Sequence, residues 1–331
     1  MAAPLIPQLL LLCILGTANF FPIGVVSTTF TITNQCDYTV WPGILSNADV
    51  APLPTTGFAL QKGETRTISP PASWGGRLWG RTHCSEDSTG KFSCITGDCG
   101  SGKVECSGSG AAPPATLAEF KLDGYGGQDF FDVSLVDGYN LPVLVSPQGG
   151  SGQNCSSTGC VVDLNGACPS DLKVVSEAGE GVACKSACEA FRQPQYCCDG
   201  AYATPDTCKP TSYSLAFKNA CPRAYSYAYD DKTSTFTCSS ADYAITFCPT
   251  PSTSQKASQG QNQGTPTMTS PPPPGTAAGG NDGRGSSPFV DGSMVYEGGE
   301  LANNGGAATT CTHVGAAVSI TLAVWRLMQF F

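Results

Sequence analysis

Short segments in which apolar and polar residues alternate recur along the chain, and such alternation is typical of strands that are buried on one face. The clearest segments are FTITN at 30–34, LAEFKL at 117–122, FFDVSLV at 130–136 and YAITF at 243–247. The alternation places Glu119 and Lys121, and likewise Asp132 and Ser134, on the polar face of a strand. Glycine and proline separate the segments, and Asp-Gly at 137–138 indicates a turn. These features predict an all-β sandwich.

One helix is predicted within this region. In GVACKSACEAF at 181–191, Cys184 and Cys188 are four residues apart and would lie on one helix face. After Pro249 the composition changes, because 251–306 is rich in Ser, Thr, Gly and Pro and carries too few apolar residues to bury a core. We therefore assign residues 28–250 to one globular domain and the segment that follows to a solvated linker.

The N-terminal segment LIPQLLLLCIL at 5–15 is apolar. It is shorter than the roughly 20 residues that cross a bilayer, and it fits the apolar part of a secretory signal peptide at 1–27 that is removed before Thr28. A retained membrane anchor is the alternative. Secretion passes the chain through an oxidising compartment, in which disulfides form.

The C-terminal segment indicates a lipid anchor. The small residues Asn303, Asn304 and Gly305 precede a short polar spacer and the apolar tail within 307–331. This order of features is that of a glycosylphosphatidylinositol attachment signal. Arg326 interrupts the apolar tail, so a transmembrane tail and an unprocessed tail remain alternatives. We expect the protein to be secreted, and to lie on the outer face of the plasma membrane if the anchor is added.

The chain contains 18 cysteines among 331 residues, which indicates a disulfide framework, metal sites or redox chemistry. Expected secretion favours disulfides, and the absence of any C-x-x-C spacing argues against zinc ribbons and thioredoxin-like sites. Sixteen of the cysteines, an even number, lie from Cys36 to Cys248. Spacing alone does not determine their pairing. For the adjacent Cys197 and Cys198 in particular, the spacing does not show which partner each sulfur binds.

The formal net charge is −9, and an acidic surface repels the phosphate backbone of nucleic acids. Only two histidines occur, His83 and His313, which leaves little room for histidine chemistry. We expect no nucleic-acid partner, no metal and no cofactor, and a monomeric protein.

The segment GKFSCITGDCGSGKVEC at 90–106 resembles the signature of the thaumatin-like proteins, a plant pathogenesis-related family. Other matching segments are TVWPG at 39–43, GRLWGRTHC at 76–84, FFDVSLVDGYNLPV at 130–143, YCCDG at 196–200 and CPRAYSYAYDD at 221–231. The resemblance covers about 28–250. It implies a β-sandwich core, a disulfide-rich loop and helix lobe near 155–220, and a small disulfide loop near 84–110.

The resemblance also implies a pairing of the cysteines into eight disulfides. The implied pairs are Cys36–Cys248, Cys84–Cys94, Cys99–Cys106, Cys155–Cys238, Cys160–Cys221, Cys168–Cys184, Cys188–Cys197 and Cys198–Cys208. In this scheme Cys197 and Cys198 bind different partners and have a structural role.

Many thaumatin-like proteins line a cleft between core and lobe with one arginine and four acids. The resemblance places them here at Arg77, Glu119, Asp132, Asp137 and Asp230. Carboxylates accept hydrogen bonds from sugar hydroxyls, and crowding of like charges raises at least one carboxyl pKa. If the cleft hydrolyses glycosides, Glu119 as acid and Asp137 as its partner are the catalytic candidates. The alternative is that these acids only form structural hydrogen-bond networks.

Three functions therefore compete. The first is a defence protein that binds β-1,3-glucan or another wall polysaccharide, with an antifungal role. The second is a weak endo-β-1,3-glucanase that uses the same carboxylates, and the third is a module that binds proteins such as microbial hydrolases or surface receptors. Outside the cleft, we expect Trp74 and Trp79 to pack in the core and His83 to lie on the surface, and Asn154 begins a formal N-glycosylation sequon.

Overall fold

The structure is a computed structural model that describes residues 28–48 and 50–250. The expected signal peptide, linker and tail, with the candidate anchor residues Asn303, Asn304 and Gly305, lie outside the described residues. Among the described residues, no helix is long and apolar enough to cross a membrane.

Strands dominate the fold, as the alternating segments predicted, and ten of them form one sheet. These strands are β1 (Phe30–Asn34), β2 (Trp41–Ser46), β3 (Thr65–Ile68), β4 (Gly75–Glu86), β5 (Phe92–Thr96), β6 (Leu117–Lys121), β7 (Asp129–Ser134), β8 (Val143–Ser151), β9 (Thr158–Cys160) and β12 (Phe236–Phe247). The main path runs β2-β4-β6-β7-β12-β1-β3, and β5, β8 and β9 join beside it.

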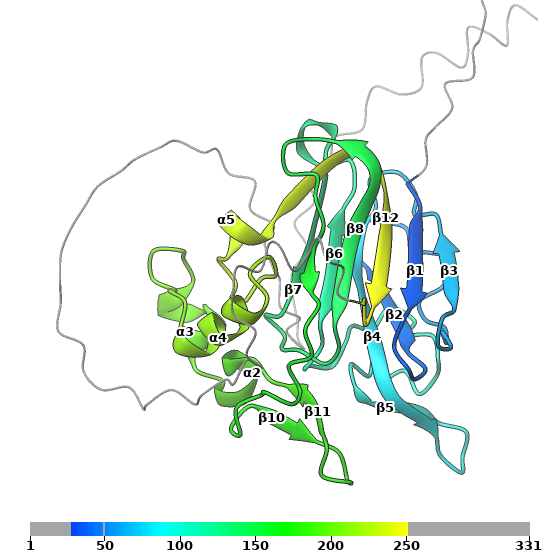
Figure 1. The fold of residues 1–331 in the computed structure, drawn as a ribbon, viewed down its shortest axis with the longest axis vertical. Coiled ribbons are helices and arrows are strands. Elements are labelled where there is room, and N and C mark those ends of the chain that lie inside the picture. The colour runs from blue at the N-terminus through cyan, green and yellow to red at the C-terminus, as the bar shows by residue number, and fades with distance from the viewer. Residues whose placement is uncertain (1–27, 49, 251–331) are drawn as a thin grey trace, which may run out of the picture. The chain divides into compact units, whose positions relative to one another are not determined.

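The ten-stranded sheet folds into the two layers of the sandwich, one with β2, β4, β6 and β7 and the other with β1, β3, β8 and β9, and the strand β12 joins them. Its first residues, from Phe236 to Cys238, pair antiparallel with β7. Its later residues pair antiparallel with β8 and parallel with β1. The predicted strand at 243–247 is therefore only the second half of a longer strand. The strand β12 thus takes part in both layers (Figure 1). Buried residues of both layers belong to one core cluster.

Aromatic rings fill the space between the layers. Phe30 of β1 packs on Phe120 of β6 with ring centroids 4.6 Å apart. Tyr243 of β12 packs 5.2 Å from Phe120 and 5.0 Å from Phe131 of β7. All four rings are buried, and their residues occupy the positions that the alternation assigned to the apolar face. Burying one such side chain contributes about 1.5–3 kcal/mol to stability.

A separate lobe is built from the remaining elements. It contains the two-stranded sheet of β10 (Lys173–Val175) and β11 (Gly181–Cys184). The other members are α2 (Ala187–Phe191), α3 (Pro194–Cys197), η2 (Gly200–Tyr202), α4 (Ser212–Ala220) and α5 (Asp231–Ser234). One further short helix, η1 (Tyr125–Gly127), joins β6 to β7. Figure 1 shows the helices α2 to α5 gathered beside the β7 side of the large sheet.

The prediction of one helix across 181–191 is wrong in its first half. Residues 181–184 form β11, and the backbone of Cys184 exchanges two hydrogen bonds with Tyr139, of 2.7 and 2.8 Å. The helix α2 begins only after Ser186, whose side chain caps it by accepting from the backbone N–H of Glu189. Cys184 and Cys188 therefore do not share a helix face.

The longest helix of the lobe, α4, was not predicted as a helix. Its sequence signal is a reciprocal cap at the N-terminus. The Thr211 hydroxyl accepts from the Ser214 backbone, and the Ser214 hydroxyl accepts from the Thr211 backbone. Phe217 of this helix is buried and belongs to the main core cluster, so α4 attaches the lobe to the sandwich.

All eight implied disulfides are present. Cys197 bonds back to Cys188 of α2, and Cys198 bonds forward to Cys208. The adjacent pair thus joins two loops of the lobe at one point, and neither sulfur is free for metal or redox chemistry.

Candidate functional site

Three of the expected site residues lie in one line across neighbouring strands, which we call the acid row. Arg77 of β4 is directly opposite Glu119 of β6, and Glu119 is directly opposite Asp132 of β7. Residues that face each other in this way project from the same side of a sheet, with Cβ atoms of direct neighbours about 4.5–5.5 Å apart. The flanking core residues Ala118 and Val133 project to the other side, where the aromatic core lies.

The acid row is not evenly exposed. Glu119 and Arg77 are partly exposed, whereas Asp132 is 1% exposed. The polar face of β7 was correctly predicted, but it is covered. Two residues further along, Ser134 forms a bridge to Tyr225 of the lobe and is 3% exposed. The lobe therefore closes over β7 and leaves the β6 end of the row open.

Burial raises the pKa of the Glu119 carboxyl to about 7, with the negative charge of Asp137 adding to the effect and Arg77 opposing it. Burial also raises the pKa of Asp132 well above its usual range, and the charges of Glu119 and Asp231 raise it further. A carboxyl group with a pKa near neutrality can both release and accept a proton under physiological conditions. Glu119 thus has the property expected of an acid–base residue.

Asp137 approaches the row from a turn that follows β7. The turn is closed by a 2.9 Å bond from the Gly138 N–H to the Leu135 carbonyl, and the Asp137 carbonyl accepts from Ala115. Gly138 has a φ of 87°, and a Cβ there would lie 2.7 Å from a carbonyl oxygen of Cys184. The turn predicted from Asp-Gly is therefore formed and fixed, and it holds Asp137 within electrostatic range of Glu119.

The fifth expected residue, Asp230, is engaged in a local network. One carboxylate oxygen accepts from the backbone and hydroxyl of Ser226 at 3.0 and 2.9 Å and pairs with Lys218 at 2.8 Å. The other accepts from Thr233. These bonds order the segment that leads into α5. Asp230 therefore has a structural role that does not depend on ligand binding.

The neighbouring acid Asp231 was not singled out in the sequence, yet its charge acts on Asp132. Its carboxylate accepts a 2.9 Å bond from the Tyr225 hydroxyl, which also bonds to Thr235. Burial is the largest cause of the raised pKa of Tyr225, and the charge of Asp132 adds to it. The sequence signal available was the repeated acid in YDD, but nothing in it tells which of the two aspartates meets Lys218.

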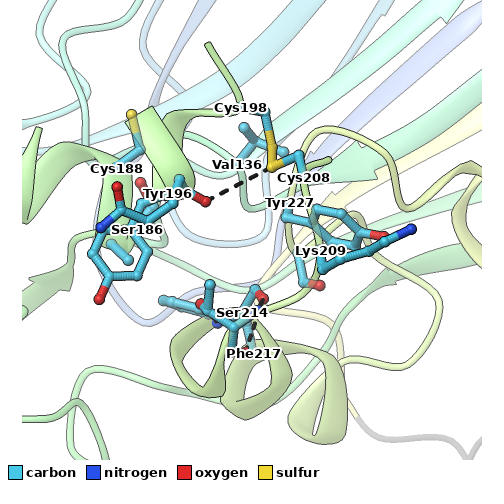
Figure 2. Close-up of a pocket in the computed structure, with 14 residues that line it drawn as sticks. Val136, Ser186, Cys188, Tyr196, Cys198, Cys208, Lys209, Ser214, Phe217 and Tyr227 are labelled. Atoms are coloured by element: carbon cyan, nitrogen blue, oxygen red, sulfur yellow. Dashed lines mark hydrogen bonds between the residues drawn. A yellow bond between two sulfur atoms is a disulfide. The ribbon is translucent and has the colours of Figure 1, made fainter. Parts of the chain in front are cut away.

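A small pocket lies in the lobe next to these residues (Figure 2). It is lined by Tyr196 of α3 and Phe217 of α4, together with Val136 and Tyr227. Its interior holds about 20 Å³, room for roughly one water molecule. The pocket is therefore too small for a sugar ring.

The remaining expectations concern residues outside the row. Trp74 and Trp79 are 0% exposed and donate to Ser46 and Gly97 respectively, so both are packing residues as predicted. His83 is exposed, also as predicted. The Asn154 amide donates to the carbonyl of Thr235 at 2.7 Å, so the folded protein uses this side chain in a tertiary contact. Its glycosylation stays a prediction.

Comparison with known proteins agrees with this architecture. The model of the thaumatin family matches residues 34–249. The chain belongs to the thaumatin family. The sandwich, the disulfide-rich lobe and the eight disulfides are all features that the resemblance to this family implied.

Three relatives show the range within the thaumatin family. Thaumatin-like protein 1 of Arabidopsis thaliana is 59% identical over 233 residues, which are 69% of this chain and 88% of that protein. A PR5-like receptor kinase of the same organism is 59% identical over 242 residues, 72% of this chain, but the chain spans only 36% of the kinase. A glucan endo-1,3-beta-glucosidase of Prunus avium is 54% identical over 227 residues, 68% of this chain and 92% of that protein.

Proposed function

We propose that the protein is a secreted defence protein that binds β-1,3-glucan at the open end of the acid row. The observation that carries the proposal is the direct opposition of Arg77, Glu119 and Asp132 on three neighbouring strands. Glu119 and Asp137 supply oxygen acceptors for sugar hydroxyls, and Arg77 supplies donors. The relative named as a glucan endo-1,3-beta-glucosidase supports this class of ligand.

Retention on insoluble β-1,3-glucan tests the proposal. Glu119→Gln and Asp137→Asn each remove one negative charge and keep the side-chain shape. Each should weaken retention by about 1.5–3 kcal/mol, the cost of losing a hydrogen bond to a charged group. Glu177→Gln is the matched control, because Glu177 is exposed on the hairpin between β10 and β11 and lies outside the row. If Glu119→Gln and Asp137→Asn bind as the parent does, the row is structural and the proposal fails.

A second function, slow hydrolysis of the same glucan, is favoured by one specific observation. The Glu119 carboxyl has its pKa raised to about 7 beside the carboxylate of Asp137, and glycoside hydrolysis uses an acid of raised pKa with a second carboxylate. An enzyme should lose reducing-sugar release in the Glu119→Gln variant while it largely keeps ground-state binding, because a catalytic acid acts mainly in the transition state. If the protein only binds glucan, the Glu119→Gln variant should lose retention, and neither the parent nor the variant should release reducing sugar.

A further inference from the structure

The Asp132 carboxyl is held under conditions that disfavour its ionised form. It is 1% exposed, and its Oδ2 atom is buried and receives no hydrogen bond from the described part of the chain. An ionised carboxylate can only accept hydrogen bonds, and one that is buried without donors pays a desolvation cost of several kcal/mol. A protonated carboxyl can instead donate from the same oxygen.

The titratable groups around Asp132 come from several elements. Glu119 faces it from β6 and the charge of Asp231 acts on it from α5, while the charge of Asp132 in turn acts on the Tyr225 hydroxyl in the segment before α5. Asp137 follows in the turn after β7. Arg77 stands opposite Glu119 rather than opposite Asp132.

In the described part of the chain, Lys218 is engaged elsewhere, because its ammonium group is bonded to Asp230, Ala224 and Ser234. Two like charges directly opposite each other on neighbouring strands destabilise a sheet. The Glu119–Asp132 pair is such an arrangement if both groups are ionised. One shared proton removes the repulsion and turns the pair into a charge-assisted hydrogen bond, which is about twice as strong as a neutral one.

We propose that Asp132 is a neutral carboxylic acid that donates its proton to the carboxylate of Glu119 and so positions Glu119 for the ligand. Asp132 is therefore a positioning residue rather than a ligand-binding one. This inference rests on the proposed function of the acid row and specifies how that row is controlled. With Asp132 neutral and Asp230 paired to Lys218, the site carries much less negative charge than its residues suggest. Such a site fits an uncharged polyhydroxylated ligand better than a cationic one.

The proton can be located without any ligand. In protein labelled with ¹³C at the side-chain carboxyls, an NMR titration of the parent should show Asp132 still protonated at neutral pH. The Asp132→Asn variant mimics the neutral acid, so the midpoint of the Glu119 titration should stay nearly unchanged. If Asp132 is ionised in the parent, its midpoint will be low, and Asp132→Asn will lower the Glu119 midpoint by removing a negative charge. Either result overturns the inference.

Retention on insoluble β-1,3-glucan then separates the two proposals. Asp132→Asn should bind within about twofold of the parent, because a neutral group of the same shape replaces a neutral group. Glu119→Gln should bind at least about tenfold more weakly, which corresponds to 1.4 kcal/mol. Equal loss in both variants overturns the positioning role. If the parent itself is not retained, the proposed function fails, while the titration of the parent still decides where the proton resides.

Discussion

Replacing Glu119 by Gln should make the protein more stable at alkaline pH. The folded state raises the pKa of Glu119 from 4.5 to about 7, so it holds the proton more tightly than the unfolded state does. The stability due to this group is fully present below pH 4.5 and is lost as the pH rises through 7. Since one pKa unit corresponds to about 1.4 kcal/mol, the loss amounts to about 3 kcal/mol.

Glutamine cannot ionise, so the variant should keep the stability that the parent loses. For a domain of this size, about 3 kcal/mol corresponds to a difference in Tm of roughly 6–12 °C. The assay is calorimetric unfolding of parent and variant from pH 4 to pH 9 with the disulfides intact. The two curves should separate between pH 4.5 and about pH 7 and run parallel at higher pH, and Glu177→Gln should follow the parent throughout. If Glu119→Gln loses stability with pH as steeply as the parent, burial does not control the Glu119 charge and the reasoning is refuted.

Three further outcomes are expected. Peptide mapping without reduction should place Cys197 and Cys198 in separate bridges, and a bond between them would contradict the lobe described here. Lys218→Met should destabilise the protein by about 3 kcal/mol, because it leaves the Asp230 charge unpaired; adding Asp230→Asn should restore part of the loss, and full additivity of the two changes would argue against the ion pair. Phosphatidylinositol-specific phospholipase C should release the native protein from membranes, and the released protein should lack the C-terminal tail that contains Trp325. Recovery of an intact C-terminus would contradict lipid anchoring.

The strands of the sandwich were predictable because their signal is local. Alternation within 117–122 and 130–136 assigned Glu119 and Asp132 to polar faces, and both faces were correctly identified. Their direct opposition was not predictable, because register depends on how two strands align in space. The burial of Asp132 could not be predicted from the local sequence either, because Tyr225 and the lobe that cover it come some ninety residues later in the chain.

The lobe shows where local signals mislead. Residues 181–191 have a helical spacing of cysteines, but pairing with β10 and with Tyr139 holds the first four residues as a strand. Tertiary contacts override local preference in such short segments. The same holds for the adjacent acids Asp230 and Asp231, which are equivalent in sequence. Contact with Lys218 makes the first a structural group and leaves the second to act on Asp132.

The Cys36–Cys248 disulfide determines how the domain would bear tension. It joins the ends of the parallel neighbours β1 and β12, only two residues before the last described residue, Thr250. A protein tethered through its C-terminus and pulled by a bound polymer would feel the load first at Cys248. Without the bridge, that load would peel β12 away from its neighbours one hydrogen bond at a time. With it, the force divides between two strands through a covalent bond, so the two strands should resist the load together.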